Sequence, residues 1–222
     1  MELYEVMRTT FAARAFTDAS IPDATLYKIL DAARFAPSGG NRQGWYVIVV
    51  QERATREALA ALTAPTAKRY VAQQQAGENP WNAVEPTSVD TATIERTPAP
   101  AHLTEPFLKA AVVLVVCVDL KVVAATDQYL QRVGVISGAS IYPFVWSLLL
   151  AARHEGFGGT ITTLTVAQEP KLQELFGLPS HVAVCAVIPL GKPVKQLTKL
   201  RRKPVPQFAM REHWGGVPFT TS

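Results

Sequence analysis

The segment from Arg34 to Val50, RFAPSGGNRQGWYVIVV, joins the end of a helix to a strand and decides how the chain is organised. Upstream, apolar residues recur at i, i+3, i+4 and i+7 from Leu26 to Ala33, which predicts the buried face of an amphipathic helix. Pro37 has no amide proton to continue that helix, so the helix should end at about Phe35. The continuous apolar run from Tyr46 to Val50 predicts a short strand that is covered on both faces.

The loop between this helix and this strand, residues 38–43, has the composition of a ligand-binding wall. Gly39 and Gly40 have no Cβ, so their backbone amides can approach a ligand closely. The loop also carries Ser, Asn and Gln side chains, which both donate and accept hydrogen bonds. We interpret it as the wall of a cofactor pocket. The alternative is an ordinary polar connection between a helix and a strand.

The remaining elements predict an α+β fold, in which a sheet is packed by helices. Further helices are expected at 2–10, 53–64, 134–154 and 168–176, and further strands at 110–118 and 182–188. The helix at 134–154 is apolar nearly all round, so it should be buried on every side, in a core or against another subunit. The tail after residue 193 has no clear period and is expected to cross to a partner subunit.

A proline-rich stretch at 64–106 is poor in periodicity, although 67–75 is compatible with a short helix. A loop of this length in a compact domain is usually a lid, a binding insertion or disordered. Its aromatic residues have two interpretations, a mobile cover over a site or a plug that fixes the insertion to the body. The residues concerned are Tyr70, Trp81 and Phe107.

Composition favours one domain over residues 1–222, because 48% of the chain is hydrophobic and no composition break divides it. Charged residues make up 18%, a low share that suggests coverage by a second subunit. The chain has no apolar run of membrane-spanning length and no secretory signal, so we expect a cytoplasmic protein. The net charge of +4 is concentrated at 192–203 without interleaved aromatics, which argues against nucleic-acid binding.

The sequence contains no recognisable hydrolytic or metal constellation. The four histidines lie far apart, without the helical spacing of a metal pair. Cys117 and Cys185 lie in apolar runs, where a free cysteine behaves as a small buried hydrophobe, so we expect no disulfide. This pattern fits chemistry at a bound cofactor, which the protein holds and tunes.

Two cationic regions, at the start and the end of the chain, are candidates to hold a phosphate. Guanidinium groups present a rigid fork of donors, and hydroxyl groups add short hydrogen bonds. The candidates are Arg8, Thr9, Thr10, Arg14, Arg201 and Arg202. As alternatives, Arg8 pairs with Glu5 at the surface, and the basic tail is only a solvated face.

Four segments, in this order, resemble the nitroreductase superfamily of FMN-dependent oxidoreductases. They are MRTTFAARAFTD at 7–18, the pattern AxxAPSGGNRQGW at 33–45, GASIYPFVWSLLLAARHEGFGGTITTL at 138–164, and LRRKPVPQFAMREHWG at 200–215. The chain departs from the superfamily in its first segment. There, Ala12 takes the position of the serine in the usual Arg-x-Ser-x-Arg spacing.

The resemblance implies a central mixed or antiparallel sheet, a long buried helix, an extended C-terminal arm and an intertwined homodimer with FMN at the subunit interface. It also implies that a backbone amide of Thr162 or Thr163 reaches the reactive ring nitrogen. Ser38 and Asn41 would contact the ribityl chain or ring edge across the interface, with Arg42 or Gln43 near the pyrimidine edge. The expected cofactor contacts are Arg8, Thr9, Thr10, Arg14, Pro37, Ser38, Gly39, Asn41, Gln43, Ile161, Thr162, Thr163, Arg201 and Arg202.

The activity that the resemblance implies is hydride transfer from NADH or NADPH to FMN, and then to a small electron-poor aromatic such as a nitroaromatic or a quinone. Two alternatives lie within the superfamily, a reduced deazaflavin as donor and fragmentation of the flavin itself. A third is a protein that binds or stores FMN without turnover. No membrane, metal or nucleic-acid partner is expected.

Overall fold

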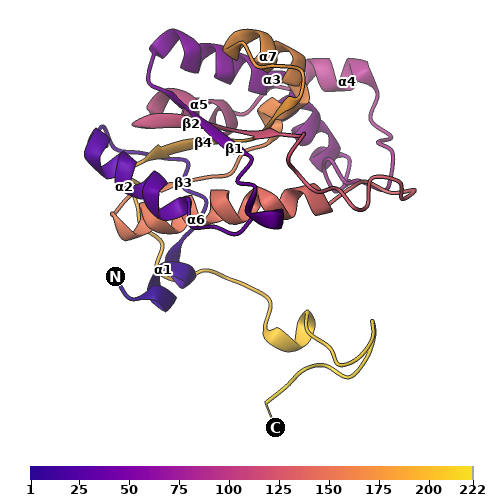
Figure 1. Cartoon of the computed structure of the whole chain (residues 1–222). Coiled ribbons are helices and arrows are strands. Elements are labelled where there is room, and N and C mark those ends of the chain that lie inside the picture. Colours follow the sequence, from indigo (N-terminus) through magenta and orange to yellow (C-terminus); the bar gives the residue numbers. More distant parts are fainter. Residues whose placement is uncertain (222) are drawn as a thin grey trace.

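A computed structural model of the chain describes residues 1–221 and has an antiparallel sheet at its centre (Figure 1). The sheet order is β1-β2-β4-β3. The strands are β1 (Trp45–Val50), β2 (Val112–Asp119), β3 (Gly158–Gly159) and β4 (Val182–Gly191). Together with seven α-helices in the described residues, the sheet confirms the predicted α+β class.

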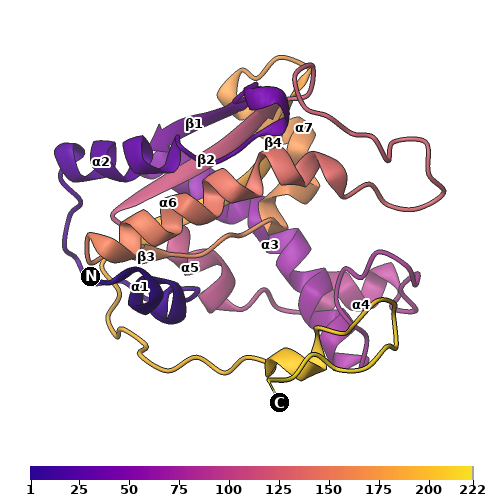
Figure 2. The ribbon, with the colours of Figure 1, turned by 60° about the horizontal axis from the view of Figure 1, so that its bottom comes forward.

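Helices cover both faces of the sheet. Alternate residues of β2 and β4 point to opposite sides and are apolar on both, so each face needs a layer of helices to bury it. On one face, α2 (Asp23–Ala33) and α6 (Tyr142–His154) pack against Leu114 and Ile188. On the other face, α3 (Arg53–Gln75), α5 (Ala101–Lys109) and α7 (Glu169–Phe176) pack against Val115 and Val187. Figure 2 shows α6 crossing in front of the sheet. The two cores make a three-layer arrangement.

The burial predicted for the strand at 46–50 is wrong for the single chain. Tyr46 is 60% exposed and Val49 is 42% exposed. β1 pairs only with β2, so it is an edge strand of the sheet. No further strand lies beside it to help cover its side chains. By contrast, β2 lies between β1 and β4 and is buried along nearly its whole length.

The helix predicted to end at Ala64 continues to Gln75 as α3, with Pro65 inside it. A proline removes one helical hydrogen bond, but packing on both sides of Pro65 offsets that cost. Leu59 and Ala67 are fully buried, and the Thr63 and Thr165 hydroxyls lie 2.7 Å apart in the core. Tertiary contacts therefore join two predicted helices into one.

The stretch at 64–106 is more ordered than its prolines predict. It contains the end of α3, then α4 (Thr91–Arg96) and most of α5. Asp90 caps α4 by accepting a hydrogen bond of 2.7 Å from the Thr93 amide. Phe107 is fully buried in the core beside α3, so it is a plug rather than a cover.

The long apolar helix predicted at 134–154 begins only at Tyr142. A 3₁₀ helix at Ile136–Ser140 precedes it, and Pro143 fits the first turn of α6 but not a helix interior. Complete burial is also wrong for the single chain. Tyr142 is 42% exposed and Trp146 is 41% exposed, and they form one outward stripe at a spacing of four residues.

Both ends of the chain lie on the α6 side of the sheet (Figure 1). Helix α1 (Leu3–Thr9) packs near α6, and the tail after residue 193 runs away from the body as an extended arm. The arm exposes large aromatic residues, among them Phe208 and Trp214. Among residues 1–221, no helix is both long enough and apolar enough to span a membrane.

Candidate functional site

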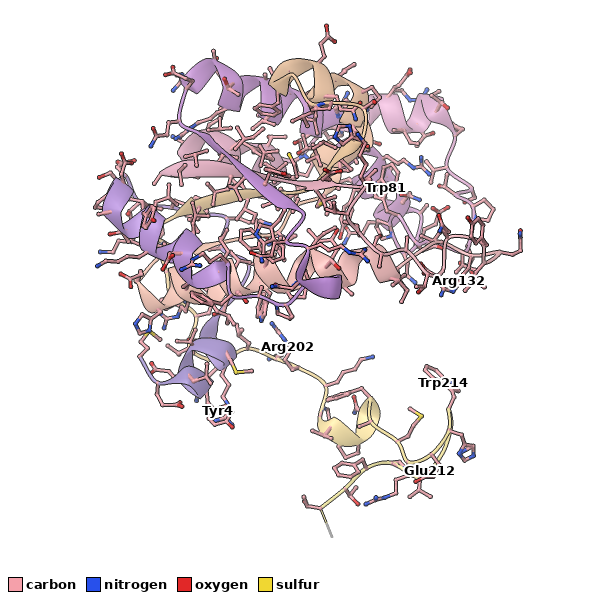
Figure 3. The ribbon with its side chains drawn as sticks, in the orientation of Figure 1. Tyr4, Trp81, Arg132, Arg202, Glu212 and Trp214 are labelled. Carbon is pink, nitrogen blue, oxygen red and sulfur yellow. The ribbon has the colours of Figure 1, made fainter. Side chains whose placement is uncertain are left out.

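A cavity of about 260 Å³ lies where the N-terminal turn, α6 and the turn after β3 meet. Its lining includes Thr10, Arg14, Ile161 and Arg202, so it joins predicted site residues from the start, the later part and the end of the chain. We call it the anchor cavity. Figure 3 shows Arg202 close to the body, at the beginning of the arm, whereas Trp214 lies far out on the arm.

Backbone contacts fix the N-terminal turn to the sheet beside this cavity. The Ala13 amide donates a hydrogen bond of 3.0 Å to the Gly159 carbonyl oxygen, and Ala12 forms a parallel bridge with Gly159. A Cβ on Gly159 would lie 2.6 Å from the Pro189 carbonyl oxygen, so only glycine allows this approach. The sheet thereby places Arg14 next to the turn at 160–163.

The anchor cavity has cations without acidic partners. Arg14 makes one long hydrogen bond of 3.5 Å to the Ala12 carbonyl oxygen, and Arg202 Nη1 donates to the Arg201 carbonyl oxygen at 2.7 Å. Neither guanidinium is in an ion pair within residues 1–221. Both are therefore available to an anion such as a phosphate. Arg201 is exposed and does not line the anchor cavity.

The other residues of the predicted N-terminal anchor are engaged elsewhere. The hydroxyl groups of Thr9 and Thr10 each donate to a helix carbonyl oxygen at 2.7 Å, and Thr9 Oγ1 also accepts from Arg153 Nε at 3.0 Å. The Arg8 guanidinium lies 5.8 Å from the Tyr4 ring centroid and lines a neighbouring cavity with Thr10 and Arg202. Arg14 and Arg202 are thus the better-placed donors.

A second cavity, of about 430 Å³, shares Arg14, Thr160 and Ile161 with the anchor cavity and adds Thr162 and Thr163. We call it the turn cavity. Its far wall comes from α3 and α5 and includes Tyr70, Gln74 and His102. No sequence motif indicates Gln74 or His102 as site residues. The expected helix at 67–75 already places Tyr70 and Gln74 four residues apart on one face, but only the packing of α5 beside α3 brings His102 to them.

The Thr162 and Thr163 amides of the turn at 160–163 differ in their hydrogen bonding. The Thr162 amide donates to the Val187 carbonyl oxygen at 3.0 Å, and the Val187 amide returns a bond of 2.9 Å. The Thr163 amide has no hydrogen-bond acceptor within residues 1–221. Thr163 is exposed and lines the turn cavity, so its amide can reach a ligand.

The loop at 37–43 lies away from both cavities in the single chain. Ser38 Oγ accepts from the Gln43 amide at 2.9 Å, and the Gly39 amide donates to Ser140 Oγ at 3.0 Å. Asn41 and Gln43 have φ angles of 52° and 50°, which are uncommon for residues other than glycine. Pro37, Asn41 and Gln43 are exposed. Such strain is typical of loops with a function.

A third cavity, of about 960 Å³, adjoins the turn cavity through Tyr70, Thr163 and Leu164. We call it the aromatic cavity, because Trp81 and Tyr142 also line it. Cys185 lines it as well, and burial raises the pKa of its thiol to about 12. Burial, the first cause of this shift, disfavours a negative charge at this wall.

The described residues contain no group of His, Cys, Asp and Glu side chains that could hold a metal ion. Cys117 and Cys185 are both free thiols. Burial raises the pKa of the Cys117 thiol to about 11. The site therefore offers guanidinium groups, the free amide of Thr163 and aromatic walls, which suit a phosphorylated planar cofactor.

Comparison with known proteins gives a consistent picture. A model of the nitroreductase family matches residues 7–192. The NADH dehydrogenase of Thermus thermophilus is 28% identical over 205 residues, which cover 89% of this chain and 89% of that protein.

Two solved structures share the fold over 96% of this chain and 100% of theirs. A BluB-like flavoprotein from Clostridium difficile 630 has a TM-score of 0.72 at 18% identity. An oxidised iodotyrosine deiodinase bound to FMN and 3-iodo-L-tyrosine has a TM-score of 0.65 at 20% identity.

Proposed function

Because the chain belongs to the nitroreductase family, we propose that it is an FMN-dependent oxidoreductase that takes hydride from NADH or NADPH and reduces a small electron-poor aromatic compound. The observation that carries this proposal is the junction of the anchor cavity and the turn cavity. It joins two unpaired guanidinium groups, Arg14 and Arg202, to the free amide of Thr163.

In this proposal each part of the junction has one task. Arg14 and Arg202 would hold the phosphate of FMN, and the residues of the turn at 160–163 would hold its ring system. FMN, when bound, supplies the hydride-transfer chemistry. The Thr163 amide donates to the ring edge, while Gln74 and His102 are placed to act as donors at the far wall of the turn cavity. Donors aimed at a site that gains negative charge make reduction easier.

We further propose a homodimer with FMN at the subunit interface. Three surfaces of the single chain are candidates for the dimer interface. Two of them expose large aromatic side chains, namely the outward stripe of α6 and the arm, and the third is the strained loop at 37–43. A second copy would bring its loop, with Ser38 and Asn41, to the cavities. Sedimentation equilibrium should give twice the mass of the chain, and a monomer that retains FMN would contradict the shared site.

An anaerobic titration tests the proposed activity. Protein loaded with FMN should lose its yellow absorbance on addition of NADH or NADPH under argon, and regain it on addition of a nitroaromatic. Comparing the two nicotinamides gives the donor preference. Bound FMN that neither nicotinamide reduces would favour storage or another donor. The open aromatic cavity supports turnover, because a storage protein has no need of space beside the ring.

A further inference from the structure

The aromatic cavity has no charged side chain in its lining. Within residues 1–221, its wall contains no Asp, Glu, Lys, Arg or His. Aromatic rings and aliphatic groups dominate it, and the polar groups are hydroxyls, amides and the protonated thiol of Cys185. Tyr142 donates its hydroxyl proton to the Cys185 carbonyl oxygen at 3.3 Å. A charged ligand would therefore lose its hydration without gaining a partner.

Trp81 belongs to this wall and is held in an unusual backbone conformation. Its φ angle is 56°, and its amide donates to Gln73 Oε1 at 3.2 Å. Arg69 stacks on its ring, with Cζ 4.2 Å from the ring centroid. The Arg69 guanidinium is thus placed on the indole and is absent from the cavity lining. Figure 3 shows Trp81 on the body of the molecule.

A polar latch fixes the loop that carries Trp81, residues 76–90. Gln73, which is only 2% exposed, donates from Nε2 to Glu78 Oε2 at 3.0 Å. Glu78 also accepts 2.7 Å bonds from Thr87 Oγ1, Ser88 N and Ser88 Oγ. The carboxylate of Glu78 therefore ties the two ends of the loop together, and Gln73 ties both to α3.

We propose that residues 76–90 are a fixed cap, latched by Gln73 and Glu78, and that Trp81 makes the aromatic cavity an acceptor site selective for uncharged aromatic compounds. This inference rests on the proposed function, because it takes the ligand to be the electron acceptor. Trp81 is the specificity-determining residue, since it supplies a flat apolar wall. Gln73 is a positioning residue that acts through Trp81.

Isothermal titration calorimetry on the FMN-loaded, oxidised protein tests the selectivity with two compounds of nearly the same shape. Methyl 4-nitrobenzoate is uncharged, whereas 4-nitrobenzoate carries one negative charge. The wild-type protein should bind the ester about 100-fold more tightly than the acid, because the cavity cannot compensate the charge. Equal affinities, or no binding of the ester, would overturn the proposal.

Three variants test the residues. Trp81→Ala and Gln73→Leu should each weaken binding of the ester about 10-fold and leave the weak binding of the acid unchanged, whereas Trp81→Phe keeps a ring and should retain the selectivity. An ester-to-acid ratio within about twofold of wild type in both Trp81→Ala and Gln73→Leu would reject the cap. Binding to oxidised protein needs no donor, so a failed nicotinamide titration counts against the proposed function alone.

Discussion

The anchor cavity and the aromatic cavity lie on either side of the turn at 160–163 and differ in charge. The anchor cavity contains Arg14 and Arg202, neither of them in an ion pair within the described residues. The aromatic cavity has no charged side chain in its lining among those residues. The turn cavity joins them, because it shares Arg14 with the first and Thr163 with the second.

This difference in charge explains how one cleft can bind two chemically different ligands at its two ends. An anion is attracted where guanidinium groups lack partners, and it is rejected where the wall offers no charged group to replace its hydration. The phosphate of a cofactor is thereby directed to one end, and an uncharged aromatic compound to the other. The predictions below test each end of this contrast.

The largest expected effect concerns the thiol of Cys185 in the aromatic cavity. Burial, with smaller effects from Cys117 and Glu169, raises the pKa of this thiol to about 12. Iodoacetamide at pH 8 should therefore react about 1,000-fold more slowly with Cys185 in the folded protein than with a free thiol, since only the thiolate is nucleophilic. Mass spectrometry of time points gives the rate. Rapid labelling before unfolding would show that this wall tolerates an anion.

The free amide of Thr163 gives the second effect. Thr163→Pro removes this donor. Thr163 has a φ of −115°, which differs from the φ of proline, so unchanged circular dichroism and FMN retention must first show that the turn tolerates the ring. Loss of one such donor should slow reduction of the bound flavin by NADH or NADPH about 100-fold in stopped-flow measurements. Thr163→Ala keeps the amide and is the matched control. A proline variant that reacts as fast as the alanine variant would remove Thr163 from the mechanism.

A positive charge introduced into the aromatic cavity should allow this cavity to bind an anion, as we propose for the anchor cavity. Ser137 lines the aromatic cavity, and Ser137→Lys should tighten binding of 4-nitrobenzoate about 10-fold. Ser137→Met, which has similar bulk and no charge, controls for the change of shape. If the two variants change the affinity for 4-nitrobenzoate equally, then the lack of a positive charge in the cavity does not explain why the wild-type protein binds this compound weakly.

The smallest expected effect concerns the latch of the cap. Hydrogen bonds from Ser88, and then from Thr87 and Gln73, lower the pKa of Glu78 from 4.5 to about 2. Because the folded pKa is lower than the unfolded one, the carboxylate stabilises the fold above pH 4.5, and this contribution is lost as the pH falls towards 2.

Thermal unfolding of Glu78→Gln compared with wild type tests this contribution. The wild-type protein should have the higher midpoint at pH 7, and the difference should shrink below pH 4.5. A difference that is independent of pH would mean that the charge of Glu78 has no part in the latch.

The central strands of the fold could be predicted, because a strand that is buried on both faces has a continuous run of apolar residues in the sequence. The strands at 110–118 and 182–188 correspond to β2 and β4, which lie in the middle of the sheet. The helix before the quoted segment is confirmed as α2, two residues shorter than expected. The family resemblance is confirmed by the match over residues 7–192, which contains three of the four quoted segments.

The errors arise where distant contacts outweigh local signals. Pro65 predicts a helix end, but the buried contacts around it keep α3 continuous. A local contact is missed as well, because the Thr9 and Thr10 hydroxyls bond to carbonyl oxygens four residues earlier, at α1. The cap at 76–90 escapes prediction for a similar reason, because its order depends on a carboxylate that meets residues up to ten positions away.

The most direct test of the account compares the affinities of FMN and riboflavin, which differ only in the phosphate. The wild-type protein should bind FMN at least about 100-fold more tightly, since charge-assisted hydrogen bonds from Arg14 and Arg202 act on the phosphate alone. In Arg14→Ala/Arg202→Ala, with unchanged circular dichroism, the two affinities should become nearly equal while that of riboflavin stays the same. Equal affinities in the wild type, or an undiminished preference for FMN in the double variant, would contradict the account.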